Sequence, residues 1–158
     1  MTMDGAIELG KILKARGWTI GCAESCTGGL LTSRLTDIDG SSAYVKGGVI
    51  SYATEVKINL LKVRAATVEK FGVVSVETAI EMAAGVRRLL GVDVGLSTTG
   101  YAGPTGDQVG LVCIGLSTAD GTAAQKFSVC YFAMSFASLF ANSTGFSGRM
   151  PSMRSACV

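Results

Sequence analysis

Residues 23–29, in the order AESCTGG, are the segment best suited to chemistry. They follow a short apolar run at residues 18–22 and precede a helix-like stretch at residues 30–35, which predicts a strand, a tight turn and a helix. Ser25 then lies where backbone N–H groups at a helix start have no partner within the helix. Such a turn can bind an anion, or hold a serine nucleophile beside an oxyanion site. An ordinary helix N-cap is the alternative role for Ser25.

A serine nucleophile needs a base, and this chain contains no histidine. Lysine is then the obvious candidate. Tyr52 ends a predicted strand, and Lys57 lies in the first turns of the next predicted helix. In an α/β sheet, strand ends and the loops that follow them line the ligand crevice. Burial would lower the pKa of Lys57 and make it a usable base, while the Tyr52 hydroxyl could relay the proton or bind the oxyanion. On spacing alone, a surface lysine and a strand-end tyrosine are the favoured alternative.

A third segment, TGYAGPTGD at residues 99–107, leaves the end of another predicted strand. Glycine-rich loops of this kind expose backbone N–H groups and can bind phosphates or carboxylates. A plain hairpin loop is the alternative, because the segment matches neither the P-loop nor the dinucleotide-binding glycine pattern. The turn around Ser25 also lacks the Gly-x-Ser-x-Gly elbow of α/β-hydrolases.

Hydrophobic spacing and cap residues predict the elements that must position these segments. Ser75 is an N-cap candidate, Gly17 and Gly91 end helices, and Asp120 with Gly121 forms a hairpin turn. Helices are expected at residues 6–16, 27–36, 54–62, 66–71 and 76–90. Strands are expected at residues 19–23, 44–52, 92–99, 109–118 and 122–130. This order predicts a single α/β domain with a mixed sheet.

Composition excludes several classes of protein. The 158 residues are 48% hydrophobic, as in a globular domain, and a net charge of +2 is too balanced for a typical nucleic-acid binder. Five cysteines without histidine or a Cys-x-x-Cys pair make a zinc site improbable and fit reduced thiols in the cytoplasm. We also expect no signal peptide, and no membrane span, because the longest apolar stretch is shorter than the roughly 20 residues that a bilayer requires.

Together, these segments resemble the C-terminal domain of CinA, a family whose stand-alone members are nicotinamide mononucleotide (NMN) amidases. The similarity covers roughly residues 5–127. It rests on AESCTGG, on Lys57, and on four further segments: DGSS at 39–42, GGVISY at 47–52, GVVS at 72–75 and TGYAGP at 99–104. The resemblance implies a three-layer α/β fold in which helices flank a mixed sheet.

The resemblance also implies roles for individual residues. Ser25 matches the family's nucleophile, Tyr52 and Lys57 match its activators, and Thr99 lies in the same site. The implied reaction converts NMN and water to nicotinate mononucleotide and ammonia without a cofactor or metal, in a homo-oligomer such as a dimer. We expect substrate contacts from Glu24, Thr27, Gly28, Gly29, Thr99, Gly100, Ala102, Gly103, Arg149 and Arg154.

The C-terminal part departs from the family pattern. An apolar, serine-rich insert is predicted at about residues 128–145, ahead of FSGRMPSMR at 146–154. Family spacing puts Met150 where the first arginine is expected, with Arg149 one position early and Arg154 aligned with the second. We therefore interpret residues 1–158 as one domain with a truncated C-terminal helix. The altered end keeps two alternatives open: a catalytically silent nucleotide-binding module and a regulatory domain.

Overall fold

A five-stranded sheet lies at the centre of the computed structural model, which describes residues 2–102 and 108–128. Its strands are β1 (Ile20–Glu24), β2 (Val45–Ile50), β3 (Val94–Gly100), β4 (Leu111–Thr118) and β5 (Gly121–Ser128). They are arranged in the order β2-β1-β3-β4-β5. β1 pairs in parallel with β2 and β3, whereas the pairs β3–β4 and β4–β5 are antiparallel. The prediction of a mixed sheet is confirmed.

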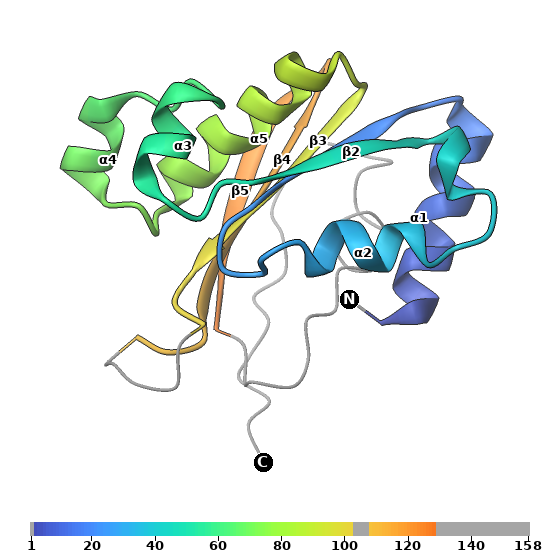
Figure 1. Ribbon diagram of the computed structural model, residues 1–158, viewed down its shortest axis with the longest axis horizontal. Coiled ribbons are helices and arrows are strands. Elements are labelled where there is room, and N and C mark those ends of the chain that lie inside the picture. Colours follow the sequence, from blue (N-terminus) through green and yellow to red (C-terminus); the bar gives the residue numbers. More distant parts are fainter. Residues whose placement is uncertain (1, 103–107, 129–158) are drawn as a thin grey trace.

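Helices cover both faces of this sheet, so the predicted three-layer arrangement is also confirmed. The helices are α1 (Met3–Arg16), α2 (Leu30–Thr36), α3 (Thr54–Asn59), α4 (Ala65–Phe71) and α5 (Val76–Leu90), with a short 3-10 turn at Ser41–Ala43. In Figure 1, α1 and α2 lie on one side of the strands and α3, α4 and α5 lie on the other. No helix within the described residues is long and apolar enough to cross a bilayer.

Each face of the sheet has its own core, and burying one large aliphatic side chain contributes about 1.5–3 kcal/mol. Beneath α1 and α2, the buried side chains are Leu9, Leu13, Ile20, Cys22, Leu31, Leu35, Tyr44, Val94, Leu96, Val112 and Ile114. Beneath α5, they are Ala23, Leu61, Val63, Met82 and Val86. Successive strand residues face opposite sides, so Ile20 and Cys22 of β1 face the first core and Ala23 faces the second.

Capping residues explain where the two long helices begin and end. The hydroxyl of Ser75 accepts a hydrogen bond from the Thr78 N–H at 3.1 Å, which confirms Ser75 as the N-cap of α5. Gly17 and Gly91 adopt left-handed conformations and end α1 and α5, as expected. Thr2 caps α1, which therefore begins three residues earlier than the sequence predicted.

The predicted start of the helix after Ser25 is wrong. α2 begins at Leu30, because Gly28 and Gly29 have φ angles of +59° and +103°, which a helix does not allow. The two glycines therefore form the turn itself. Two glycines shape β2 and its packing. The β1–β2 register shifts opposite Gly47, and a side chain at Gly48 would clash with Thr32 of α2.

The second half of the sheet is a three-stranded antiparallel unit. Thr118 pairs with Gly121, so the turn is formed by Ala119 and Asp120, and Gly121, which was predicted as a turn residue, begins β5. Gly100, which was expected to open a loop, is the last residue of β3 and packs against the backbone of β4. Several predicted features lie outside the described residues: Gly103, Arg149, Arg154, the insert after Ser128 and the truncated C-terminal helix.

Candidate active site

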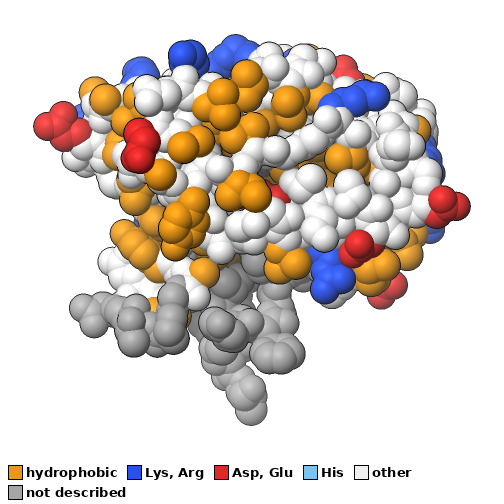
Figure 2. Space-filling view, in the orientation of Figure 1, with side chains coloured by type: hydrophobic (Ala, Val, Ile, Leu, Met, Phe, Trp, Pro, Cys, Tyr) orange, Lys and Arg blue, Asp and Glu red, His pale blue; other side chains and the backbone are white. Residues whose placement is uncertain are grey.

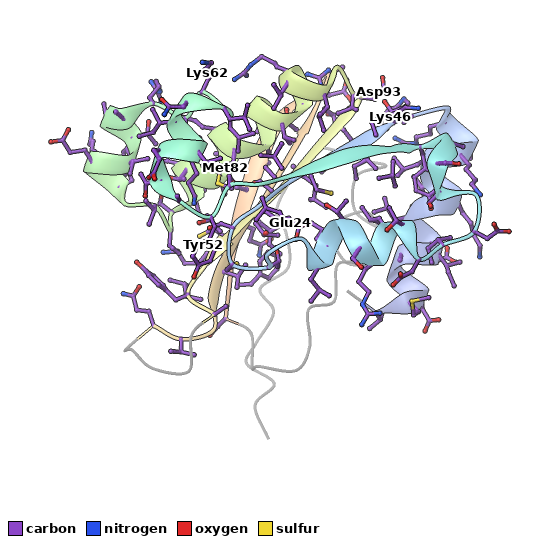
Figure 3. All side chains as sticks on the ribbon, in the orientation of Figure 1. Glu24, Lys46, Tyr52, Lys62, Met82 and Asp93 are labelled. Atoms are coloured by element: carbon purple, nitrogen blue, oxygen red, sulfur yellow. The ribbon has the colours of Figure 1, made fainter. Side chains whose placement is uncertain are left out.

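The carboxyl ends of the three parallel strands meet beside a cavity of about 340 Å³. Ser25 follows β1, Tyr52 follows β2 and Tyr101 follows β3, and all three line the cavity. Figure 3 shows Glu24 and Tyr52 at this end of the sheet. The volume is within the range of about 300–1,000 Å³ that small-molecule sites occupy.

Lys57 of α3 contacts Ser25 directly. Its Nζ atom lies 3.0 Å from the Ser25 Oγ, 2.6 Å from the Ser51 carbonyl oxygen and 3.1 Å from the Tyr52 carbonyl oxygen. The Lys57 side chain is 2% exposed, so the alternative of a surface lysine is wrong. Successive side chains of a strand face opposite sides of the sheet, which explains this contact. Glu24 faces α2, and Ser25, the next residue, faces α3.

Burial shifts the protonation equilibrium of Lys57 toward the neutral amine. Burial lowers the pKa of Lys57, although Cys26 and Glu55 act in the opposite direction. A neutral amine has two N–H donors and one lone pair. The Ser51 and Tyr52 carbonyls can accept both donors, which leaves the lone pair for the Ser25 hydroxyl proton. The arrangement can therefore act as a serine nucleophile with a lysine base.

Glu24 has a different role from the predicted substrate contact. Its carboxylate is 1% exposed and accepts hydrogen bonds from the N–H groups of Gly29, Leu31 and Thr32, at 3.0, 2.9 and 2.7 Å. The Thr32 hydroxyl donates a fourth bond to it. Burial alone would raise the pKa of Glu24, but these hydrogen bonds hold it below its ordinary value. Glu24 thus occupies the start of α2, where the sequence predicted free N–H groups for an anion.

The donors that remain free lie closer to Ser25. The Gly28 N–H bonds to the Ser25 carbonyl, whereas the N–H groups of Cys26 and Thr27 have no acceptor among the described residues. The N–H of Ser25 itself is bonded to Thr98 of β3, which fixes the turn against the sheet. An oxyanion forming beside Ser25 would therefore find a free backbone donor at Cys26, which lines the cavity.

Tyr52 contributes its backbone rather than its hydroxyl to the contact with Lys57. Its side chain is 75% exposed, and its hydroxyl forms no hydrogen bond with any described residue. The structure therefore does not bring the Tyr52 hydroxyl to Ser25 or Lys57. The neighbouring Ser51, which sequence reasoning missed, supplies the shorter carbonyl contact to Lys57. Side-chain chemistry gives no signal for such a backbone role.

The other predicted contact residues divide into two groups. Thr99, Gly100 and Ala102 line the cavity, and the Thr99 hydroxyl donates to the Val73 carbonyl at 2.8 Å. Thr27, Gly28 and Gly29 do not line it. The Thr27 hydroxyl instead bonds to the Thr98 hydroxyl at 2.7 Å, which ties the turn to β3. These three residues shape the turn without lining the cavity.

Cys26 is a second candidate nucleophile in the lining. Burial raises the pKa of its thiol to about 11, so the thiol stays protonated near neutral pH. Cys22, Cys26 and Cys113 are free thiols, whereas Cys130 and Cys157 lie outside the described residues. No group of three or more potential metal ligands occurs within residues 2–102 and 108–128. Ser25, with its lysine partner, is the better placed nucleophile.

Comparisons with known proteins show the family of this chain. The family model of the CinA C-terminal domain matches residues 4–134. A CinA-like protein of Chloroherpeton thalassium is 49% identical over 133 residues, which are 80% of this chain and 32% of that protein. The nicotinamide-nucleotide amidohydrolase PncC of Enterobacter agglomerans is 45% identical over 130 residues, which are 78% of this chain and 79% of that protein.

Solved structures share the fold. The crystal structure of a CinA superfamily protein from Klebsiella pneumoniae 700603 matches with a TM-score of 0.79 and 32% identity, over 82% of this chain and 84% of that one. The chain spans about 30% of the length of several curated relatives that it matches. The family model matches most of the sequence, and the Klebsiella protein has the same fold. This chain therefore belongs to the CinA C-terminal domain family.

Proposed function

We propose that this protein is an amidohydrolase that converts NMN and water to nicotinate mononucleotide and ammonia. The observation that carries the proposal is the 3.0 Å contact between the buried Lys57 Nζ and the Ser25 Oγ, beside a cavity of substrate size. The PncC relative, similar over most of both chains, supports a nicotinamide nucleotide as the substrate.

The first half of the reaction acylates Ser25. Neutral Lys57 removes the hydroxyl proton, and the Ser25 Oγ attacks the carboxamide carbon of NMN. The carboxamide oxygen becomes an oxyanion, which the N–H group of Cys26 stabilises. The C–N bond then breaks, and the nitrogen takes the proton from the Lys57 ammonium and leaves as ammonia.

The second half releases the product. Neutral Lys57 takes a proton from a water molecule, and the resulting hydroxide attacks the ester carbon. Ser25 leaves as the oxygen regains its proton from Lys57, and nicotinate mononucleotide departs. Lys57 acts directly in this scheme, without the relay through the Tyr52 hydroxyl that the sequence suggested, because only the Tyr52 carbonyl contacts Lys57.

The phosphate of NMN needs a site away from the start of α2, because Glu24 already occupies the N–H groups there. A second negative charge beside that buried carboxylate would be repelled. Arg149 and Arg154 stay our predicted phosphate ligands, since a guanidinium group can bind phosphate through two hydrogen bonds. The backbone around Gly100 and Ala102 is a further candidate, as both residues line the cavity.

A second candidate function is a nucleotide-binding or regulatory module without turnover. The observation that favours it is the length of the relatives, because the aligned segment is only 32% of the Chloroherpeton protein. A domain that forms part of longer proteins can act through its neighbours. Binding of NMN without ammonia release would support this alternative.

Ammonia release from NMN tests the proposed function. Wild type should release ammonia at a rate that Ser25→Ala lowers by a factor of about 10⁴ or more, as for other lost nucleophiles. Ser33→Ala is the matched control, because Ser33 is an exposed serine of α2 outside the cavity lining. A folded wild-type protein no faster than Ser25→Ala would refute the enzyme proposal.

A further inference from the structure

Two tyrosines flank Ser25 at the cavity. β1 lies between β2 and β3 in the sheet, and Glu24 at its end is in register with Ile50 of β2 and Thr98 of β3. Tyr52 lies two residues beyond Ile50, and Tyr101 lies three residues beyond Thr98. The chain therefore places one aromatic side chain on either side of the nucleophile, and both line the cavity.

Both rings are accessible to a ligand. Tyr52 is 75% exposed and Tyr101 is 44% exposed, and no described residue forms a hydrogen bond with either hydroxyl. Packing and hydrogen bonding within residues 2–102 and 108–128 thus give no reason for two large aromatic side chains here. Figure 2 shows the face of the molecule that is turned to the viewer in Figure 1. Hydrophobic side chains gather on the half of this face that holds α3 and α5, while charged side chains lie mainly at its periphery.

The charge of the lining decides what these rings can bind. Lys57 is the only Lys or Arg among the described residues that line the cavity, and none of those residues is Asp or Glu. The nicotinamide ring of NMN is a pyridinium that carries a full positive charge, so no carboxylate in the described lining balances it. Aromatic ring faces attract cations, and they are a common means of binding quaternary nitrogen.

We infer that Tyr52 and Tyr101 bind the pyridinium ring of the substrate through their ring faces and select a cationic carboxamide ring over a neutral one. The inference rests on the proposed function, from which the substrate comes. It assigns Tyr52 a binding role through its ring, in place of a proton-relay role through its hydroxyl. A phenylalanine at position 52 would keep the binding role, because it has the ring, but would lose the relay role, because it lacks the hydroxyl.

Calorimetric titration of two ligands tests the inference. The ligands are NMN and its 1,4-dihydropyridine form, which keeps the ribose, phosphate and carboxamide but has an uncharged ring. All titrations use proteins that carry Ser25→Ala, so that neither ligand is hydrolysed. Tyr52→Leu, Tyr52→Phe, Tyr101→Leu and Tyr101→Phe are each compared in that background. Phe71→Leu is the matched control, because Phe71 is also 44% exposed but does not line the cavity.

We expect NMN to bind about 10-fold more tightly than its reduced form, in line with one or two cation–π contacts. Each leucine variant should weaken NMN binding about 5-fold and leave the reduced form unaffected, so that the preference falls. The phenylalanine variants should keep most of the preference, and Phe71→Leu should keep all of it.

Four results would overturn the inference. The first two are that the Ser25→Ala protein binds NMN and its reduced form equally tightly, or that it does not bind NMN. The other two are that the leucine variants lose affinity for both ligands equally, or that they keep the full preference for NMN. Failure of the proposed function gives a different pattern. Wild type would then release no ammonia, but the Ser25→Ala protein would still bind NMN more tightly than its reduced form, and the leucine variants would still lower that preference.

Discussion

The Nζ of Lys57 lies 3.0 Å from the Oγ of Ser25, and both residues are buried. Two backbone carbonyls, of Ser51 and Tyr52, hold the same Nζ from the β2–α3 connection. The lysine therefore reaches the serine from a neighbouring strand connection and depends on backbone geometry for its orientation. A catalytic pair built this way needs no histidine, and the chain contains none.

The rate of NMN hydrolysis should rise with pH. Lys57 must be neutral to act as a base, and burial holds its pKa below the ordinary value of 10.5. The value of kcat/KM should therefore increase through the pKa of Lys57 and level off below pH 10.5. Measurements should begin near pH 7, because a phosphate monoester titrates at about pH 6. A flat or falling profile would contradict the base role of Lys57.

Stability should also rise with pH over the same window. Between the lowered pKa of Lys57 in the folded protein and 10.5, the unfolded chain binds a proton that the folded protein does not. The free energy of unfolding therefore increases with pH there. Urea denaturation at several pH values should show this slope in wild type and a smaller one in Lys57→Met. Identical slopes in the two proteins would mean that Lys57 has an ordinary pKa.

Replacing Glu24 should destabilise the turn that holds Ser25. Glu24→Ala removes the acceptor of three backbone N–H groups near the start of α2, of which that of Leu31 is buried and those of Gly29 and Thr32 are partly buried. We expect the free energy of unfolding to fall by about 3 kcal/mol, the upper range for a buried polar group without a partner. Glu69→Ala, at an exposed position of α4, is the control and should change stability little. Equal stability of the two variants would exclude this role for Glu24.

A glycine of α5 supports the segment that carries Lys57. Gly85 packs against the Leu61 carbonyl, so a side chain there would push this segment away. The Val63 N–H is bonded to the Lys57 carbonyl, which links the same segment to the base. Gly→Ala in a helix interior usually stabilises by about 1 kcal/mol, whereas Gly85→Ala should destabilise by about 2 kcal/mol. Thermal unfolding shows whether Gly85→Ala lowers or raises stability. A rise in Tm would show that the Leu61 carbonyl can move away from the added methyl group and would contradict this prediction.

Sequence patterns predicted the strands and helices well because β1 is buried on both faces and α5 has a clear N-cap and apolar stripe. The missing histidine and the order of strand ends made Lys57 a candidate base, but spacing alone favoured a surface lysine. The family resemblance was needed to pair Lys57 with Ser25. The start of α2 was mispredicted, because that depends on a carboxylate folding back onto N–H groups five to eight residues ahead. The Tyr52 hydroxyl was expected at Lys57 because sequence cannot tell a backbone contact from a side-chain contact.

The reactivity of Ser25 toward a small fluorophosphonate tests the central claim most directly, since it requires no assumption about the substrate. Peptide mass spectrometry should find the adduct on Ser25, at a rate that rises with pH through the pKa of Lys57. Lys57→Met should slow this modification by a factor of about 10² or more, the usual contribution of a general base. Modification at another residue, or an equal rate in Lys57→Met, would contradict a Ser25 nucleophile activated by Lys57.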